Sequence, residues 1–342
     1  MTKVVRYTKF SNNPHGDGGS KRSAQIEEYW RSKGVEFIEE KFEIPTQYTL
    51  LHILRWSCRA ICFITQHVGW SQFPTMHSKF KAFRIYALRI PVIYDKYKEQ
   101  KVTFLWEDTK DVTPLYLMKA AGARIIGYPH NMESLVPTQV DAITRKEAPY
   151  WLYEEIERLK QCDEVYCISK EETWLLQVFG VNAKYYPYYP PKEVEQELLE
   201  IRKLRERRKA NKVRQYLILG SATNPPTRMG MQELIDYFAQ HKDSTIFIQV
   251  AGYQTERLKV PDGSENVNFG TVSSEKLRAL LVETDGIIIY QPATSGALTR
   301  IVENRIAGIP IYANFGAARD YFNLPDVHVY NSMEELREML CD

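Results

Sequence analysis

The sequence predicts an α/β protein of two open domains that face each other across a cleft. Its 342 residues favour two domains of ordinary size over one. Short apolar segments alternate with segments of helical spacing, as in parallel sheets covered by helices. Three prolines between 187 and 191, followed by a charged segment, divide this alternation into two halves. We therefore expect an N-terminal domain over 1–190, a charged helical linker over 191–213 and a C-terminal domain over 214–342.

The elements of the N-terminal domain follow from hydrophobic spacing and from glycine and proline signals. A helix over 23–33 is expected to end at Gly34, a common helix C-cap. Two long helical stretches are expected at 48–68 and 78–99, the second broken before Pro91 because proline removes a helical N–H. The remaining expected elements are strands at 4–10, 35–38, 101–106, 124–128, 164–168 and 183–186, and helices at 114–121, 147–160 and 170–179.

The C-terminal half repeats the same alternation after a charged segment. Residues 192–212 carry Glu, Lys and Arg at i,i+4 spacing, which favours a solvated helix. The expected elements that follow are strands at 214–220, 245–251, 286–290, 309–313 and 328–330, and helices at 231–240, 275–283, 297–307 and 332–340. Ligands of such domains usually bind at the carboxyl ends of the strands.

Composition excludes several classes of function. Hydrophobic residues make up 44% and charged residues 26%, so a packed core is expected, and the net charge of +2 argues against a nucleic-acid partner. No apolar run reaches the ~20 residues of a membrane span, and no secretory signal is visible. Five cysteines without a CxxC pair indicate reduced thiols and a cytoplasmic location. Cys58 and Cys62 are expected in the core rather than at a metal.

Residues 286–308 carry the strongest chemical signal. A buried strand is followed by a loop and at once by a helix, so the backbone N–H groups of Ser295, Gly296 and Ala297 are expected at the positive end of a helix dipole. Glu303 would lie on the same side of that helix, where a carboxylate can accept bonds from both hydroxyls of a ribose. An ordinary N-cap loop with a surface glutamate is the alternative.

From Asn268 onward the sequence resembles the nucleotide-sugar half of the group 1 retaining glycosyltransferases. The resemblance covers most of the chain from about Lys101 onward, is specific in the C-terminal domain and is loose before Lys101. The matching residues are Phe269-Gly270-Thr271-Val272-Ser273, Asp285, Pro292, Ser295-Gly296, Glu303, Ala307-Gly308 and Pro310. The resemblance implies the GT-B fold, two Rossmann-like domains, and transfer of a sugar from a nucleotide-sugar donor with retention of configuration. No cofactor beyond that donor is expected.

The same resemblance implies roles for individual residues. Glu303 would hold the ribose, Ser295, Gly296 and Ala297 the diphosphate, and the turn that contains Val272 would flank the base. The family usually has a second glutamate eight positions before the ribose-binding one, and this chain has Ser295 there. That replacement leaves the contact to the donor sugar open.

Basic residues are needed to neutralise the leaving diphosphate. The family has a basic pair after the first strand of this domain, and here only Arg228 stands near that place. Arg300, one turn into the expected helix, could supply the second charge, since arginine suits two phosphate oxygens at once. A solvated loop residue is the alternative for Arg228. No Asp-x-Asp motif is present, so a metal-held diphosphate is not expected.

Two further sites are expected at strand ends of the first domain. Gly18 and Gly19 belong to a glycine loop before a helix, where a phosphate cradle and a plain turn are equally plausible. His130 follows the strand over 124–128, and in the family a histidine there contacts the donor sugar. A packed or solvent-facing histidine is the alternative.

Residues 48–101 combine nine basic residues with two acidic ones, Asp95 and Glu99, and interleave aromatic residues. Such helices suit an anionic bilayer, which would place the protein at the cytoplasmic face of a membrane with a lipid-linked acceptor. Amphipathic helices with a solvated basic face are at least as good an explanation.

The resulting expectation is a metal-independent glycosyltransferase with a saccharide or lipid-linked saccharide acceptor. Two alternatives stay open. A nucleotide-sugar epimerase of the same fold could use Glu107, Asp108 and Glu133 as acids and bases. A non-catalytic nucleotide-sugar-binding protein is favoured by Ser295 in place of the usual glutamate.

Overall fold

A computed structural model describes residues 3–42 and 50–341, and within it the chain divides into two units. Unit 1 contains Met1–Asn13 and Ser23–Pro187, and unit 2 contains Pro14–Arg22 and Tyr188–Asp342. The segment Pro14–Arg22, which the sequence places in the N-terminal domain, thus clusters with the C-terminal half of the chain. The first two residues of the helical stretch expected at 48–68 lie outside the described residues.

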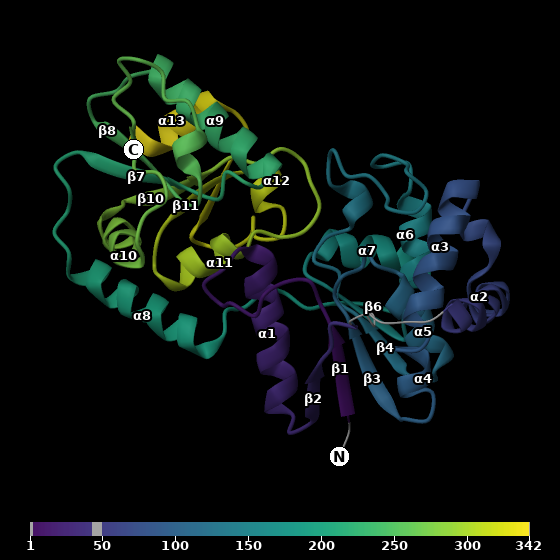
Figure 1. Ribbon diagram of the computed structural model, residues 1–342. Helices are drawn as coiled ribbons and strands as arrows, with labels where there is room; N and C mark the ends of the chain where they lie inside the picture. Colours follow the sequence, from purple (N-terminus) through teal and green to yellow (C-terminus); the bar gives the residue numbers. More distant parts are fainter. Residues whose placement is uncertain (1–2, 43–49, 342) are drawn as a thin grey trace. The chain divides into compact units, whose positions relative to one another are not determined.

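Unit 1 is built on a parallel sheet with the strand order β2-β1-β3-β4-β5-β6 (Figure 1). The strands are β1 (Lys3–Tyr7), β2 (Glu36–Glu39), β3 (Val102–Trp106), β4 (Arg124–Gly127), β5 (Glu164–Cys167) and β6 (Ala183–Tyr185). β3 is buried along its whole length, as expected for an apolar strand covered on both faces. The order of the strands reverses between β1 and β3, which is the topological switch point of this sheet.

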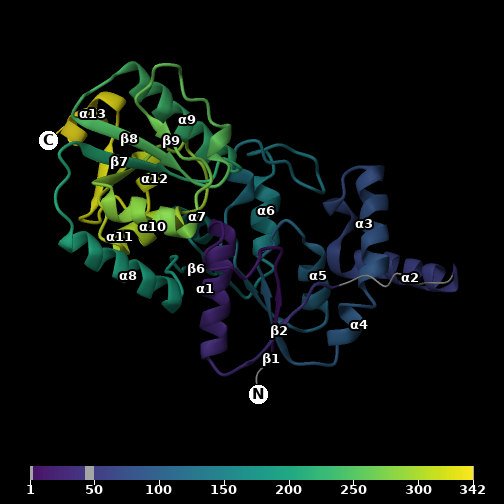
Figure 2. The same cartoon turned by 60° about the vertical axis from the view of Figure 1, so that its left-hand side comes forward.

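Helices cover both faces of this sheet. They are α1 (Gly18–Ser32), α2 (Leu50–Phe63), α3 (Met76–Arg89), α4 (Tyr94–Tyr97), α5 (Thr113–Ala120), α6 (Leu152–Leu159) and α7 (Lys170–Val178). Alternation along β1 sends Val4 to the side of Ile26 in α1, and Val5 to the core that includes Tyr86 of α3 and Leu115 of α5. The two sides are seen around the sheet in Figures 1 and 2.

Three helices of unit 1 differ from the expected ranges. α1 begins at Gly18, five residues before the expected start at Ser23. α2 ends at Phe63 in a π-turn, Ile64–Val68, that stops at Gly69. The helix expected at 147–160 begins only at Leu152, because residues before it pair with another segment. Val140 forms an antiparallel bridge with Glu147, and Ala148 donates its N–H to the carbonyl of Gln139.

Unit 2 has a second parallel sheet with the strand order β12-β11-β10-β7-β8-β9 (Figure 2). The strands are β7 (Arg214–Leu219), β8 (Ile246–Ala251), β9 (Val267–Asn268), β10 (Gly286–Ile289), β11 (Ile311–Asn314) and β12 (Val327–Tyr330). The order reverses between β7 and β10, the arrangement of a Rossmann-like sheet. The short β9 was not predicted.

The helices of unit 2 pack on both faces of the sheet and begin at places set by their caps. They are α8 (Lys192–Arg207), α9 (Pro225–Gln240), α10 (Ser274–Glu283), α11 (Thr299–Ile306), α12 (Phe315–Ala318) and α13 (Met333–Cys341). α9 begins six residues before the predicted start, because Asn224 caps it and Pro225 fills the first helical position. α12 was not predicted.

α8 is not the solvated linker that its charges indicate. It buries Val194, Leu198 and Ile201 in the same core as β10, α10 and α11. Arg205 donates to the carbonyl oxygens of Leu281, at 2.7 Å, and Thr284, at 2.6 Å. Burial lowers the pKa of Arg205 to about 10. α8 is therefore a structural helix of unit 2.

Two expectations about the surface of unit 1 can be compared with the structure. Cys58 and Cys62 are exposed on α2 rather than in the core, whereas Cys162 and Cys167 are buried. In the part of the chain that the structure describes, no helix has the length and apolar character needed to cross a bilayer.

Candidate functional site

The carboxyl edge of the unit 2 sheet brings several predicted residues together at its switch point. Arg300 of α11 lies across the ends of β7 and β10. Its Nη1 donates to the carbonyl of Leu219 at 3.2 Å, and its Nη2 donates to Oε1 of Gln291 at 3.2 Å. Gly220 makes room for it, since a Cβ there would lie 2.8 Å from that Nη1. The guanidinium is thus held at the place where open α/β sheets bind ligands.

Arg300 is a cation without a counter-ion in the described residues. No ion pair joins it to a carboxylate there, and its buried Nε has no hydrogen-bond partner. Burial lowers the pKa of Arg300 to about 10, so the group stays charged at neutral pH. A partly buried cation that is paired only with carbonyl oxygens favours an added anion.

The loop before α11 corrects the predicted helix start. α11 begins at Thr299, after Leu298 as N-cap, so Ser295, Gly296 and Ala297 precede the helix instead of opening it. Leu298 offers no side-chain cap, and the first-turn N–H groups at the positive end of the dipole belong to Thr299 and Arg300. The helix starts late because Gly296 has a φ of +82°, which α-helical backbone does not accommodate.

Contacts that sequence reasoning missed hold this loop in place. Arg319 donates to the carbonyl oxygen of Gly296. The side chain of Asn314 pairs with the backbone of Gln291, accepting from its N–H at 2.9 Å and donating to its carbonyl at 3.0 Å. These partners lie 23 positions away along the chain, so no local pattern announces them.

A second helix N-terminus lies beside α11. A Cβ on Gly18, the first residue of α1, would lie 3.6 Å from Oγ1 of Thr299, the first residue of α11. Asp17 caps α1 by accepting from the N–H of Ser20 at 2.8 Å. Gly18 and Gly19 therefore form the first turn of α1 rather than a loop, and they lie next to the start of α11.

Glu303 is a buried residue with two partners. Nζ of Lys21 lies 2.5 Å from its Oε2, and the hydroxyl of Tyr188 donates to its Oε1 at 2.8 Å. Burial and the charge of Glu303 raise the pKa of Tyr188 well above its ordinary value. This excludes a plain surface glutamate. Since a carboxylate has about four acceptor positions, Glu303 still has capacity for a further hydroxyl.

Arg228 and Val272 both belong to unit 2. Arg228 follows β7, and Val272 follows β9. Arg228 is exposed in the first turn of α9, so it is not a loop residue, and its neighbour Thr227 lies against Gly220. Val272 is half-buried in the turn between β9 and α10 and packs on the core. The structure thus places both near strand ends of the sheet, with Arg228 close along the chain to the switch point.

His130 belongs to a buried polar cluster in unit 1. Its ring stacks on Phe10, with centroids 4.1 Å apart, and its Nε2 lies 3.4 Å from Oε2 of Glu107. Its Nδ1 has no hydrogen-bond partner among the described residues. Arg6 contacts the other oxygen of Glu107 at 2.5 Å, and Ser23 donates to Oε2 at 2.8 Å. His130 is therefore packed, with one ring nitrogen unused.

The carboxylates of the epimerase alternative all face cations. Burial opposes ionisation of Glu107, but the hydrogen bond to His130 and the charge of Arg6 outweigh it and hold the pKa of Glu107 below its ordinary value. Asp108 pairs with Lys9 at 2.9 Å, and Glu133 pairs with Lys110 at 3.0 Å. Ion pairing stabilises the charged carboxylates and disfavours their use as proton donors.

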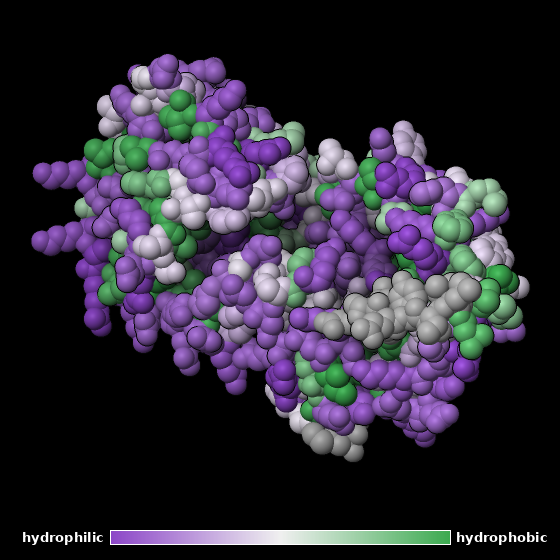
Figure 3. Space-filling view, in the orientation of Figure 1, coloured by the Kyte–Doolittle hydropathy of each residue, from purple (hydrophilic) through white to green (hydrophobic). Residues whose placement is uncertain are grey.

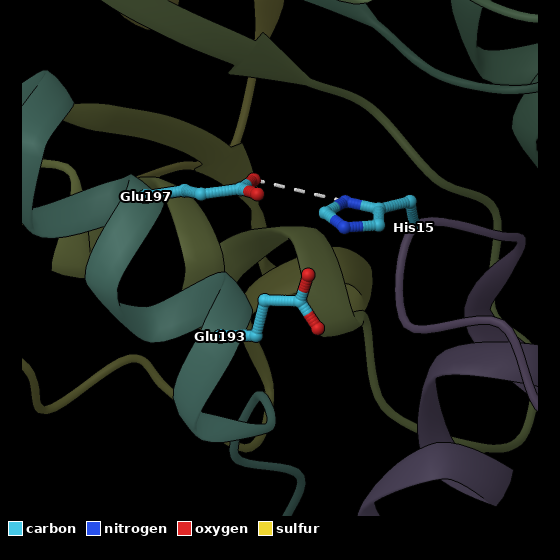
Figure 4. A group of neighbouring side chains, drawn as sticks. All are labelled: His15, Glu193 and Glu197. Carbon is cyan, nitrogen blue, oxygen red and sulfur yellow. Dashed lines mark ion pairs between the residues drawn. The ribbon is translucent and has the colours of Figure 1, made fainter.

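One group in the described part of the chain has the geometry of metal ligands. His15 lies opposite Glu193 and Glu197, which are one turn apart on α8, and one ligand atom from each lies within 4.8 Å of the others (Figure 4). Nδ1 of His15 is 3.8 Å from Glu197, and both side chains are about half exposed, 51% and 50%. All three side chains are exposed, and exposed acidic groups of this kind are common without a metal ion.

Comparisons with known proteins connect this geometry to a fold. No protein-family model matches the chain, and no curated protein matches it. Solved structures do match. The trehalose-phosphate synthase of Burkholderia xenovorans, described as UDP-forming, superposes with a TM-score of 0.62 at 9% identity, over 99% of this chain and 90% of its own.

Two further structures agree with this match. HepE of Anabaena, in complex with UDP and glucose, has a TM-score of 0.59 at 12% identity, over 100% of this chain and 89% of its own. Sucrose-phosphate synthase of Thermosynechococcus elongatus has a TM-score of 0.57 at 12% identity, over 100% of this chain and 90% of its own. Together with the two parallel sheets and their flanking helices, these matches show that the chain has the GT-B fold, with two Rossmann-like α/β units.

Proposed function

We propose that this protein transfers a sugar from a nucleoside-diphosphate sugar to a saccharide or lipid-linked saccharide acceptor. The observation that carries the proposal is Arg300, a cation without a carboxylate partner in the described residues, at the switch point of unit 2. It lies in the first turn of α11, whose N-terminus adjoins that of α1. Two helix dipoles and a guanidinium favour a diphosphate there.

The proposal assigns a role to each predicted residue of unit 2. Arg300 and Arg228 neutralise the diphosphate, which also accepts from the backbone of Ser295, Gly296 and Ala297. Glu303 binds the ribose. Val272 flanks the base, and Gly18 and Gly19 let the donor approach the start of α1. Because arginines and helix termini supply the positive charge, the reaction needs no metal.

The chemical step exchanges one bond to the anomeric carbon for another. The bond between that carbon and the diphosphate oxygen breaks, and a bond to the acceptor hydroxyl oxygen forms. The hydroxyl proton passes to the leaving diphosphate on the same face of the sugar, which retains the configuration. His130 keeps the role that the resemblance implies, contact with the transferred sugar.

We propose in addition that α2 of unit 1 contacts an anionic membrane at the cytoplasmic face. Leu51, Leu54 and Ile61 share one face of α2 and are 75%, 58% and 49% exposed. Apolar side chains gather over α2 near the right-hand edge of the surface in Figure 3. The exposed Arg55 lies on the same helix. An apolar row beside cations suits the boundary between headgroups and acyl chains.

A turnover assay tests the proposal. UDP-sugars are the first donors to try, because the structure of HepE contains UDP and glucose and the Burkholderia enzyme is described as UDP-forming. The purified protein is incubated with each donor, with and without a panel of acceptors, and products are followed by NMR. Release of UDP with a new glycosidic bond supports transfer. An epimerised donor would support the epimerase, and binding without turnover the non-catalytic protein.

A further inference from the structure

Unit 1 contains a cavity of about 270 Å³ at the switch point of its own sheet. Lys9, which follows β1, lines one side, and residues 108–113, which follow β3, line another. One face of α3 closes it with Ser78, Ala82 and Tyr86, spaced by one helical turn. The cavity thus lies where an open sheet with this strand order binds ligands.

Much of the wall of the cavity is apolar. Phe73, Val112 and Ala82 are buried, and Ile85 and Ile143 line the cavity as well. These side chains cannot form hydrogen bonds with a polar group of a ligand. A bound molecule therefore needs an apolar body to gain from burial against them.

One part of the wall is cationic and has unused donors. Lys81 is exposed and has no ion-pair partner among the described residues. Arg89 is paired with Asp111 through Nη1, but its Nε has no partner. The hydroxyl of Tyr86, a residue only 1% exposed, has none either. Lys81 and the unused donors of Tyr86 and Arg89 lie along one face of α3, which favours an oxygen anion there.

The other charged residues of the wall are matched within the protein. Lys9 pairs with Asp108 at 2.9 Å. Lys110 pairs with Glu133 at 3.0 Å and donates to Gln139 at 2.8 Å. The uncompensated charge of the cavity is therefore the positive charge of Lys81.

We propose that this cavity binds an amphiphilic organic anion, with its apolar body against Phe73 and Val112 and its carboxylate or phosphate at Lys81 and Arg89. Binding of this anion is inferred from the cavity alone. A role for the anion as the sugar acceptor would rest on the proposed function. Lys9 precedes Phe10, and Asp108 follows Glu107, and both Phe10 and Glu107 contact His130. A hydroxyl on the ligand would therefore lie in the neighbourhood of His130.

Calorimetric titration with n-octyl phosphate tests the proposal, with n-octanol and inorganic phosphate as probes that lack one half of the ligand. We expect n-octyl phosphate to bind at least ~10-fold more tightly than either, since it alone combines an apolar body with a charge-assisted contact. 4-Hydroxybenzoate is titrated as a second anion, and the tighter of the two anions distinguishes a lipid phosphate from an aromatic acid.

Variants locate the binding in the cavity. Lys81→Ala and Tyr86→Phe are each expected to weaken binding of the preferred anion by ~3- to 10-fold. Lys79→Ala, on the same helix but outside the cavity wall, is the matched control and should not change it. Tyr86→Phe removes only a hydroxyl without a partner, so its thermal unfolding is expected to match that of the unchanged protein.

Equal affinity for n-octanol and n-octyl phosphate, no binding of either anion, or binding unaffected by Lys81→Ala would each overturn the proposal. The titration contains no nucleotide, so it is independent of the donor site in unit 2. If nucleoside diphosphates fail to bind while n-octyl phosphate binds through Lys81, the proposed function fails and the cavity remains. If nucleoside diphosphates bind and n-octyl phosphate does not, the proposed ligand of the cavity is wrong and the donor site remains.

Discussion

At the scale of single residues, the two arginines proposed for the diphosphate differ in how the protein holds them. Arg300 is fixed by Leu219 and Gln291 and retains an unused Nε. Arg228 is exposed and makes no hydrogen bond with its side chain among the described residues. Arg300 is therefore pre-organised for an anion, whereas Arg228 must lose side-chain entropy to contact it.

Because Arg228 is exposed, replacing it should affect binding without affecting folding. We expect Arg228→Ala to change the free energy of unfolding by less than ~0.5 kcal/mol and to weaken binding of UDP by ~10-fold. Urea unfolding and calorimetry measure the two effects. Arg278→Ala, on the exposed face of α10, is the control and should change neither. Unchanged UDP binding in Arg228→Ala would show that Arg228 is a solvated residue.

Glu155 gives unit 1 a pH-dependent stability. It is buried in α6, where it accepts hydrogen bonds from the backbone N–H groups of Glu133, at 2.8 Å, and Ser134, at 2.9 Å. Burial outweighs these bonds and raises the pKa of Glu155 from 4.5 to about 7. Because the folded state binds this proton more tightly, the stabilisation is complete below pH 4.5 and is lost as the pH rises through 7.

We therefore expect the free energy of unfolding to fall between pH 5 and pH 8 by an amount on the order of 3 kcal/mol from this residue, at 1.36 kcal/mol per pH unit. Urea unfolding across that range measures it. Glu155→Gln should remove this part of the pH dependence, while Glu157→Gln should keep it, because the side chain of Glu157, on the same helix, is 32% exposed. The same pH dependence in both variants would contradict the assignment.

At the scale of elements, α8 shows how a charged helix can still belong to a core. Its buried face carries Val194, Leu198 and Ile201, and Leu199 lies beside them 39% exposed. We expect Leu198→Ala to lower the free energy of unfolding by about 2–4 kcal/mol through a cavity in the core of unit 2. Leu199→Ala should cost about 0.5 kcal/mol or less. Chemical denaturation measures both losses. A loss as small in Leu198→Ala as in Leu199→Ala would show that α8 is the solvated linker first expected.

α2 makes a separate prediction about membranes. If its exposed leucines enter a bilayer, Leu54→Glu should reduce co-sedimentation with vesicles of anionic lipid by ~10-fold, because burying a carboxylate there is costly. Trp174→Glu, on α7 and 65% exposed, is the control. Vesicles of neutral lipid should bind more weakly than anionic ones. If Leu54→Glu binds anionic vesicles as well as the unchanged protein does, α2 is an ordinary amphipathic helix that does not enter the bilayer.

The elements also show what local sequence could predict. Apart from the short β9, the strands lie within a few residues of their predicted positions, because buried parallel strands are continuous apolar runs bounded by turn residues. The start of α9 was missed although Asn224-Pro225 is a readable cap and first position. The late start of α6 could not be read locally, since it depends on pairing of residues 139–140 with 147–148.

The candidate site divides in the same way. The loop before α11 and Glu303 carry a pattern within one segment, so the sequence indicates them. The partners of Glu303 are Lys21 and Tyr188, which lie 282 and 115 positions from it along the chain. The cavity of unit 1 is lined by four separate segments. Contacts of this kind depend on the fold and have no local signature.

At the scale of the whole molecule, each unit holds a candidate site at its own topological switch point. Unit 2 places Arg300 and two helix N-termini at the reversal between β7 and β10. Unit 1 places an amphiphilic cavity at the reversal between β1 and β3. In our proposals a diphosphate occupies the first site and an amphiphilic anion the second, so that each unit would bind a different substrate.

The most direct test of the central claim, a metal-independent diphosphate site in unit 2, is calorimetric titration of UDP into the full chain in EDTA. We expect micromolar affinity that EDTA does not reduce, weakened ~10- to 100-fold in Arg300→Ala and weakened also in Glu303→Ala. Arg305→Ala, in the last turn of α11, should bind like the unchanged protein. Absence of UDP binding, or the same affinity in Arg300→Ala, would contradict the donor site.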